Sequence, residues 1–361
     1  MISAQLESST PVFQVEGQVR GELARDLRHL EVEETTAGMK TLRATFVGTG
    51  PKTGQKQEVQ LYLDGSIFDF GSKLDVSIGP EGDARTIFTG FVSGLEASLY
   101  HDKTPQVTAF AEDKLMGFRL TRRSKTYKQK SDAQIAQAIA SEHGLRAQAD
   151  ATGPTYDVVQ QWNMSDLAFL RERARLIQAE IWFQNDTLYF RSRGSRNATD
   201  LTLVHENDLV DVEARADLAH QRTSVKVSGY NAAARQHIDQ EAGADAIQSE
   251  ISGGRIGPTI LQSAFGENIS YRVREVPLQD DEARAWARAE MLRRCRQFVT
   301  VAGTTKGSPD MMVGSNVTLD GVGKAFDGPG YYVTHVRHVY DMTLGHRTHF
   351  EAERPTLQEG A

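Results

Sequence analysis

The sequence has a single cysteine, Cys295, among 361 residues, and it has no apolar run as long as a membrane span. One cysteine excludes an internal disulfide framework and is typical of proteins kept in a reducing compartment. The first residues, 1–5, lack the basic and apolar segments of a signal peptide. We therefore expect a chain that is made in the cytoplasm and that, if it leaves the cell, leaves as part of something else.

Apolar residues are also scarce, at 39%, which is low for one compact globule. Extended β-barrels that share their burial with neighbouring subunits have such a composition. The formal charge of −7 at pH 7 does not favour binding to nucleic acid or to an anionic membrane. The length is sufficient for roughly two to four domains.

Motifs for catalysis are missing as well. The glycine-rich segment 48–54 resembles a phosphate-binding loop, but no Gly-Lys-Ser or Gly-Lys-Thr closes it and no apolar helix follows. The sequence has no Gly-X-Ser-X-Gly elbow, and local sequence places no base beside Cys295. Adjacent acids such as Asp280 and Asp281 are explained by their place at the start of a helix. We expect no enzymatic activity and no cofactor.

Four histidines lie close together near the C-terminus: His335, His338, His346 and His349. Four imidazoles in one place would suit zinc. On a strand, however, residues three apart point to opposite faces, and no cysteine or carboxylate set completes a site. We interpret the four histidines as ordinary polar residues of a barrel, and we predict no metal site.

The pattern along the chain predicts a mainly β protein with insertions. Alternating residues punctuated by glycine and proline predict a first β-barrel over residues 1–118. A second β-barrel is expected over 196–230 and 297–361, where strands return. Residues 119–195 are expected to form an α+β insert, and 231–296 a loop-rich insertion with a helix from about Asp280. No sequence repeat links the two barrels, so any duplication is expected to be structural only.

The insert has the clearest local signals. Ser131 and Gln134 have the spacing of a capping box, and Ser165 with Asp166 begins a second helix. The apolar runs 181–183 and 188–190, separated by four polar residues, predict a hairpin.

These residues resemble a known family. The phrases that carry the resemblance are Ser131-Asp132-Ala133-Gln134-Ile135-Ala136, Glu142-His143-Gly144-Leu145 and Gln160-Gln161-Trp162-Asn163-Met164-Ser165-Asp166-Leu167-Ala168-Phe169-Leu170. In order and spacing they are similar to the phage late-control D family of contractile-tail hubs and to the N-terminal hub region of VgrG spike proteins. The resemblance covers nearly the whole chain. It implies two similar barrels per chain and three chains in a pseudo-sixfold ring. No oligonucleotide-fold domain or β-helical needle follows residue 354, so the spike would be a separate polypeptide.

A run of cations without an acid precedes the first helix of the insert, and it comprises Arg119, Arg122, Arg123, Lys125, Lys128 and Lys130. One interpretation is a solvated linker between domains. The other is an electrostatic contact with an acidic partner surface or with the tube lumen. Nucleic acid is the third choice, because only Tyr127 accompanies the cations as a stacking platform.

The sequence therefore predicts a structural baseplate hub of a contractile tail or injection system, which adapts a sixfold inner tube to a threefold spike. The expected partners are two further copies in a homotrimer, a separate spike protein, an inner tube or tube-initiator protein and other baseplate proteins, with no membrane span and no specific nucleic acid. Two alternatives remain: a tail-associated cell-wall-degrading enzyme, and a nucleic-acid-binding module. The sequence leaves open whether the particle is a phage tail, a bacteriocin or a toxin-injecting system.

Overall fold

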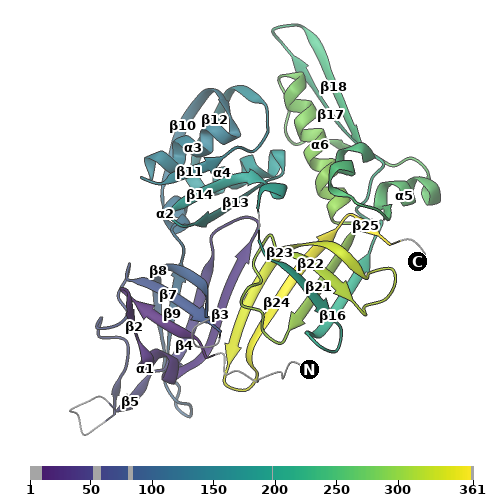
Figure 1. The fold of residues 1–361 in the computed structure, drawn as a ribbon. Coiled ribbons are helices and arrows are strands. Elements are labelled where there is room, and N and C mark those ends of the chain that lie inside the picture. The colour runs from purple at the N-terminus through teal and green to yellow at the C-terminus, as the bar shows by residue number, and fades with distance from the viewer. Residues whose placement is uncertain (1–9, 52–57, 80–83, 197, 359–361) are drawn as a thin grey trace.

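The computed structural model describes residues 10–51, 58–79, 84–196 and 198–358. The chain is mainly β, as expected, with two insertions at one end of the strands (Figure 1). The start of the chain at 1–5, and Lys52, Thr53 and Gly54 of the glycine-rich segment, lie outside the described residues. No helix within the described ranges is long and apolar enough to cross a bilayer.

The first β domain surrounds a core of aromatic and branched side chains that includes Phe13, Phe46, Phe68 and Phe88. Alternate residues of its strands point into this core, as in β7, where every second side chain is buried. The domain consists of β1 (Val12–Val15), β2 (Gln18–Val19), α1 (Gly21–Asp26), β3 (Leu27–Thr35), β4 (Thr41–Val47), β5 (Thr49–Pro51), β6 (Glu58–Gln60), β7 (Lys73–Ile78), β8 (Arg85–Ser98) and β9 (Gln106–Glu112).

The α+β insert follows β9, and its core continues into residues 217–298 through side chains such as Val227 and Trp286. Ser131 caps α3 in a complete capping box with Gln134, and Ser165 caps α4, both as predicted. The predicted hairpin is β13–β14, which turns at Asn185 and Asp186. The insert consists of α2 (Leu115–Leu120), β10 (Arg122–Ser131), α3 (Asp132–Glu142), β11 (Arg146–Ala149), β12 (Thr155–Ser165), α4 (Asp166–Ile177), β13 (Ala179–Gln184), β14 (Thr187–Ser192) and the short η1 (Arg193–Ser195).

The second β domain has a separate core, which includes Val301, Val317, Tyr331 and Phe350. It consists of β15 (Asp200–Val204), β16 (Leu209–Ala216), β21 (Val299–Thr305), β22 (Asn316–Asp320), β23 (Gly328–Asp341) and β24 (Gly345–Arg354), with β25 (Thr356–Leu357) behind it.

A second insertion, residues 217–298, interrupts this domain between β16 and β21. It consists of β17 (Ser224–Asn231), β18 (Gln236–Gly243), η2 (Ala244–Glu250), β19 (Arg255–Ile256), α5 (Gly257–Phe265), β20 (Ile269–Arg272) and α6 (Asp280–Arg296). The prediction that residues 196–230 belong to the second barrel is wrong for β17, because β17 pairs with β18 and β20 instead of with barrel strands. The insertion therefore begins earlier than the predicted residue 231.

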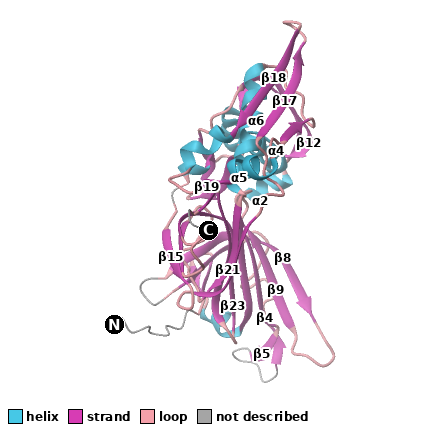
Figure 2. Cartoon of the chain, turned by 90° about the vertical axis from the view of Figure 1, so that its right-hand side faces the viewer, coloured by secondary structure: helices cyan, strands magenta, loops and turns pink. Residues whose placement is uncertain are grey.

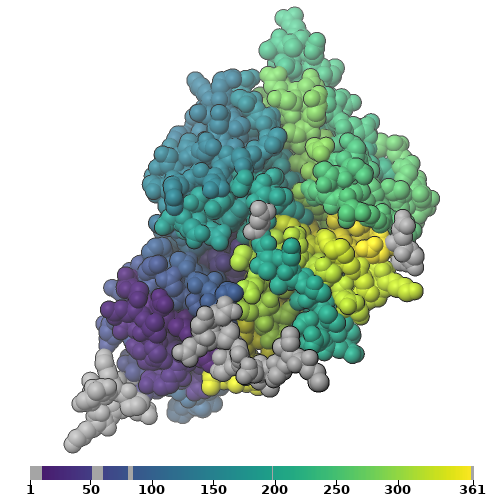
Figure 3. Space-filling view, viewed as in Figure 1, coloured from purple at the N-terminus to yellow at the C-terminus, as the bar shows by residue number. Residues whose placement is uncertain are grey.

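The two insertions lie side by side above the β domains (Figures 1 and 3). Arg175 of α4 pairs with Glu275 at 2.7 Å, and Trp286 of α6 donates to Tyr156 Oη at 3.4 Å. Figure 2 shows the strands running away from this end. The chain thus has one end built of β hairpins and an opposite end built of two unlike insertions.

The two β domains share one 13-stranded sheet. They are joined by antiparallel pairing of β3 with β23, from Thr35 opposite His335 to His29 opposite Asp341. Arg85 also pairs with Asp310 across the joint at 2.8 Å. The sequence did not predict this joint, because nothing local marks β3 and β23 as neighbours.

The two halves of the sheet repeat one topology. The strand order in the first is β3-β4-β9-β8-β7-β1, and in the second it is β16-β21-β24-β23-β22-β15. When these six strands are numbered in chain order within each half, the two halves have the same order across the sheet. Each strand of the first half therefore has a counterpart at the same position in the second half. One difference is that β1 pairs antiparallel with β7, whereas β15 pairs parallel with β22.

The irregularities of the sheet repeat too. The β3–β4 register shifts between Leu27 and His29, and the β16–β21 register shifts between Leu209 and Asp211. Each long hairpin has a bulge at a hydroxyl residue. Ser93 Oγ donates to Phe110 O at 3.3 Å, and Thr334 Oγ1 donates to Glu351 O at 3.3 Å. Because bulges are placed features of a sheet, these matches indicate two copies of one unit.

Candidate functional site at the junction of the domains

Buried ion pairs cross the place where the insert meets both β domains. Glu180 of β13 is their centre. Its carboxylate accepts a hydrogen bond from Tyr332 Oη of β23 at 2.7 Å, and it lies 3.5 Å from Arg193 Nε and 3.4 Å from Arg196 Nη1. Each arginine then reaches a different β domain, because Arg196 pairs with Glu34 of β3 and Arg193 pairs with Glu353 of β24.

Aromatic rings cover both guanidinium groups. Arg196 lies over Trp182 at 4.7 Å from the ring centroid, and Arg193 lies over Tyr332 at 4.2 Å. Trp182 is stacked in turn on Tyr189 at 4.7 Å. Planar guanidinium groups suit such sites, because they can stack on a ring and pair with a carboxylate at the same time. The junction therefore fixes the insert against both β domains.

The two buried acids beside the junction, Glu34 and Asp113, have pKa values shifted in opposite directions. Burial favours the neutral form of Glu34, but Lys40 at 3.1 Å and Arg196 outweigh it and hold the Glu34 pKa below its usual range. Asp113 differs, because burial raises its pKa to about 6, although the backbone N–H groups of Lys40 and Leu115 donate to its carboxylate.

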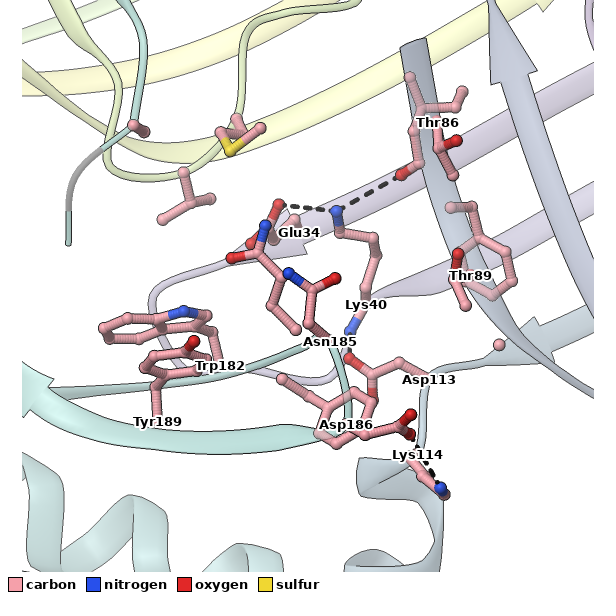
Figure 4. A pocket seen from close by; sticks show the side chains of 18 of the residues that line it. Glu34, Lys40, Thr86, Thr89, Asp113, Lys114, Trp182, Asn185, Asp186 and Tyr189 are labelled. Carbon is pink, nitrogen blue, oxygen red and sulfur yellow. Dashed lines mark hydrogen bonds and ion pairs between the residues drawn. The ribbon is translucent and has the colours of Figure 1, made fainter. Parts of the chain in front are cut away.

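A pocket of about 710 Å³ opens beside this network. Figure 4 shows Lys40 beside Glu34, with Asp113 nearby and Asn185 on the hairpin turn facing them. Thr86 and Thr89 of β8 form the opposite wall. The pocket thus lies between the first β domain, the β13–β14 hairpin and the segment around Met312.

The lining charges of the pocket are paired with one another or with nearby groups. Lys73 lies 3.2 Å from Asp75, and Lys114 lies 3.1 Å from Asp186. Among the described residues, neither histidine nor cysteine lines the pocket. The arrangement holds parts of the chain together.

The predicted interface run lies on two elements of the insert. Arg119 is in α2 and pairs with Glu112 at 3.2 Å. The other five cations lie on β10, which pairs along its length with β12. From Arg122 to Lys130 the run is therefore a largely exposed, hydrogen-bonded strand inside the insert, and only the domain-linking part of the linker interpretation is wrong.

The structure divides the run into inward and outward cations. Arg123 pairs with the fully buried Asp166 at 2.9 Å, and Lys125 pairs with Glu142. Arg122 bonds to Asn163, while Lys128 and Lys130 are exposed and have no ion-pair partner among the described residues. Contact with a partner protein stays a prediction. Lys128 and Lys130 are the positions that test it, because replacing Arg123 would remove the arginine partner of the buried Asp166 inside the insert.

The structure brings two of the four C-terminal histidines together. His338 Nδ1 and His346 Nε2 are 3.2 Å apart, and both rings are buried. His335 instead pairs with Glu33 at 2.8 Å, and His349 bonds to Thr304. In the part of the chain that the structure describes, no cluster of three or more possible metal ligands occurs.

Cys295 is fully buried in α6, and burial raises the pKa of its thiol to about 12. The reactive species is the thiolate, so we expect no reaction of the folded protein with a thiol reagent near pH 8. Unfolding in guanidinium chloride should release the reaction at once, which a colorimetric thiol assay measures. Rapid labelling of the folded protein would contradict the burial of this side chain.

The functional residues that sequence reasoning missed are those of the junction: Glu34, Glu180, Arg193 and Arg196. Arg196 and Glu34 are far apart in the sequence, and no motif links them. The only sequence signal for these residues is a charged side chain on a predicted strand. Many exposed residues of this chain have the same signal, so it does not single out the junction.

Comparison with known proteins gives one family model and several solved structures with a similar fold. A family model described as the Alg8 N-terminal domain matches residues 53–341. The chain belongs to that family. The description prints no activity, and the family is not the hub family that the motifs resemble, so membership assigns no function here. No curated protein sequence matches the chain.

Solved structures show which fold this is. A 43 kDa tail protein of prophage MuSo2 from Shewanella oneidensis is 14% identical, with a TM-score of 0.67 over 96% of this chain and 99% of that one. A tail protein from Neisseria meningitidis is 12% identical, with a TM-score of 0.63 over 96% of both chains. An Escherichia coli component of the type VI secretion system, itself structurally similar to bacteriophage T4 tail proteins, is 12% identical, with a TM-score of 0.58 over 97% of this chain and 79% of that one. The chain has the fold of these tail proteins.

Proposed function

We propose that this chain is a structural hub of a contractile tail or injection system and not an enzyme. One observation carries the proposal: the sheet repeats one topology twice within a chain that has a tail-protein fold. A chain with two equivalent β domains presents six such domains when three copies surround an axis. Such a ring offers sixfold positions to an inner tube.

The insertions supply the other half of the argument. The α+β insert and the second insertion are unlike, and each occurs once per chain. Three copies therefore present them with threefold symmetry at the opposite end, which suits a threefold spike. The expected partners are a separate spike protein, an inner tube or tube-initiator protein and other baseplate proteins.

The interior of the junction agrees with a mechanical role. The charges that line its pocket are paired with one another or with nearby groups, and the buried arginines each join the insert to one β domain. Such networks fix relative orientation more than they add stability. The hub would then act by geometry, as a rigid adapter between two symmetries.

The test is to purify the particle that contains the chain and to count its copies by cryo-electron microscopy. We expect three copies around the axis, between a tube and a spike. Six copies in a ring, one copy, or a chain found outside any tail-like particle would overturn the proposal.

A further inference from the structure

We propose that copies of this chain join edge to edge, with β16 of one copy pairing antiparallel with the end of β8 in the next copy. This inference rests on the proposed function, for which it supplies the contact between neighbouring copies. The partner at each edge is a second copy of this chain. The pairing of β3 with β23 inside the chain is the model for the contact.

The repeat identifies the two free edges. Inside the chain, β3 pairs with the part of β23 that extends beyond β22. By the repeat, β16 corresponds to β3 and β8 corresponds to β23. In the described part of the chain, β21 is the only strand that pairs with β16, whose first residue Leu209 also makes a single bridge to His205. In the same part of the chain, β8 has no strand beside residues 93–98 on the side away from β9. Each free edge is thus the counterpart of an edge that is paired in the joint.

The shared bulges fix the register. Leu27 corresponds to Leu209, and Ser93 corresponds to Thr334. In the internal joint, Glu33 lies opposite Arg337. The same register between copies places Arg215 opposite Glu96.

The side chains agree with this register without having been used to set it. Arg215 and Glu96 are exposed and opposite in charge, and the half-buried Glu33 and Arg337 of the internal joint are opposite in charge too. On the other face of the new pair, apolar side chains meet apolar ones: Leu95 with Ala216, Ala97 with Ala214, and Leu99 with Val212. A slip by one residue would set these apolar groups against the charged ones.

Exposure along both edges is the third argument. Leu99 is 64% exposed, Tyr100 is 55% exposed and Val210 of β16 is 53% exposed. Open edges with apolar side chains invite strand pairing, and proteins normally cover them. A neighbouring copy would cover all three. Because the contact is head to tail, it closes into a ring when the rotation at each joint allows it.

Charge exchange tests the register. We expect Glu96→Arg alone and Arg215→Glu alone to weaken each contact about fivefold, because like charges would lie opposite each other. The combined Glu96→Arg and Arg215→Glu variant should recover assembly, measured as the copies incorporated into purified particles. Glu267→Arg, an exposed change on the second insertion, is the matched control and should have no effect. A double variant as defective as the singles would overturn the proposal.

Cross-linking tests the contact directly. Glu96→Cys with Arg215→Cys places thiols on directly opposite residues, within reach of a disulfide. Oxidation of assembled particles should then give covalent multimers that end at the trimer. Glu96→Cys with Glu213→Cys is the register control, since a diagonal pair is roughly 7–8 Å apart and should not link. Cys295 is buried and stays out of the reaction.

The outcomes separate this inference from the proposed function. A particle with three copies but no 96–215 cross-link overturns the edge pairing and leaves the hub. A 96–215 cross-link in a chain that belongs to no tail-like particle leaves the pairing and overturns the hub.

Discussion

Replacing Glu180 with Gln should lower the free energy of unfolding by about 3 kcal/mol, because two buried arginines lose a shared counter-charge. The change keeps the size of the side chain and removes only its charge. Arg193 and Arg196 keep Glu353 and Glu34, so the chain should still fold. The measurement is the midpoint of urea unfolding, followed by circular dichroism.

Glu172→Gln is the matched control, since Glu172 is exposed on α4 of the same insert. This control should change the free energy by less than about 0.5 kcal/mol. Equal midpoints for the two variants would show that the junction does not hold the insert in place.

Acid should destabilise the folded protein through the buried pair His338 and His346. Burial, followed by the charges of His346 and Lys40, lowers the pKa of His338 to about 3. Burial, followed by the charge of Arg347, lowers the pKa of His346 to about 4. In the unfolded chain both titrate near the ordinary value of about 6.5.

The sign follows from proton binding. Below about pH 6.5 the unfolded chain binds protons that the folded chain does not, so acid favours unfolding. Above that pH both states are neutral at these rings and the effect vanishes. Between about pH 8 and pH 5 each histidine should cost about 2 kcal/mol of stability.

Urea unfolding at a series of pH values measures this dependence. The double variant His338→Gln, His346→Gln should show a flatter profile between about pH 5 and pH 7, whatever its stability at neutral pH. His220→Gln, at an exposed position, should leave the profile unchanged. A steep profile in the double variant would assign the acid sensitivity to other groups.

Local features of this chain could be predicted from its sequence. The caps at Ser131 and Ser165 and the β13–β14 hairpin depend on residues within a few positions of each other. The acidic start and basic end of α6 are local in the same way. Such features follow from the sequence because the groups that satisfy one another are neighbours along the chain.

Pairings across the chain could not be predicted in this way. The alternating residues of β17 fit any sheet, so they gave no sign that their partners are β18 and β20 instead of barrel strands. The repeat is equally hidden, because the two halves share register and bulges while their side chains differ. Ser93 and Thr334 match in chemistry, yet Gly94 corresponds to His335 and Phe110 to Glu351. The charged side chains of the junction could not be predicted either, because the residues that pair there are far apart in the sequence.

The place of the second insertion has a consequence for how this protein can change. In the first β domain, residues 36–40 connect β3 to β4, and residues 217–298 make the corresponding connection in the second. The short turn shows that the sheet needs only a few residues there. The long connection therefore stands at a site that tolerates a large difference in length, and this segment can change without a change in the strands of the sheet.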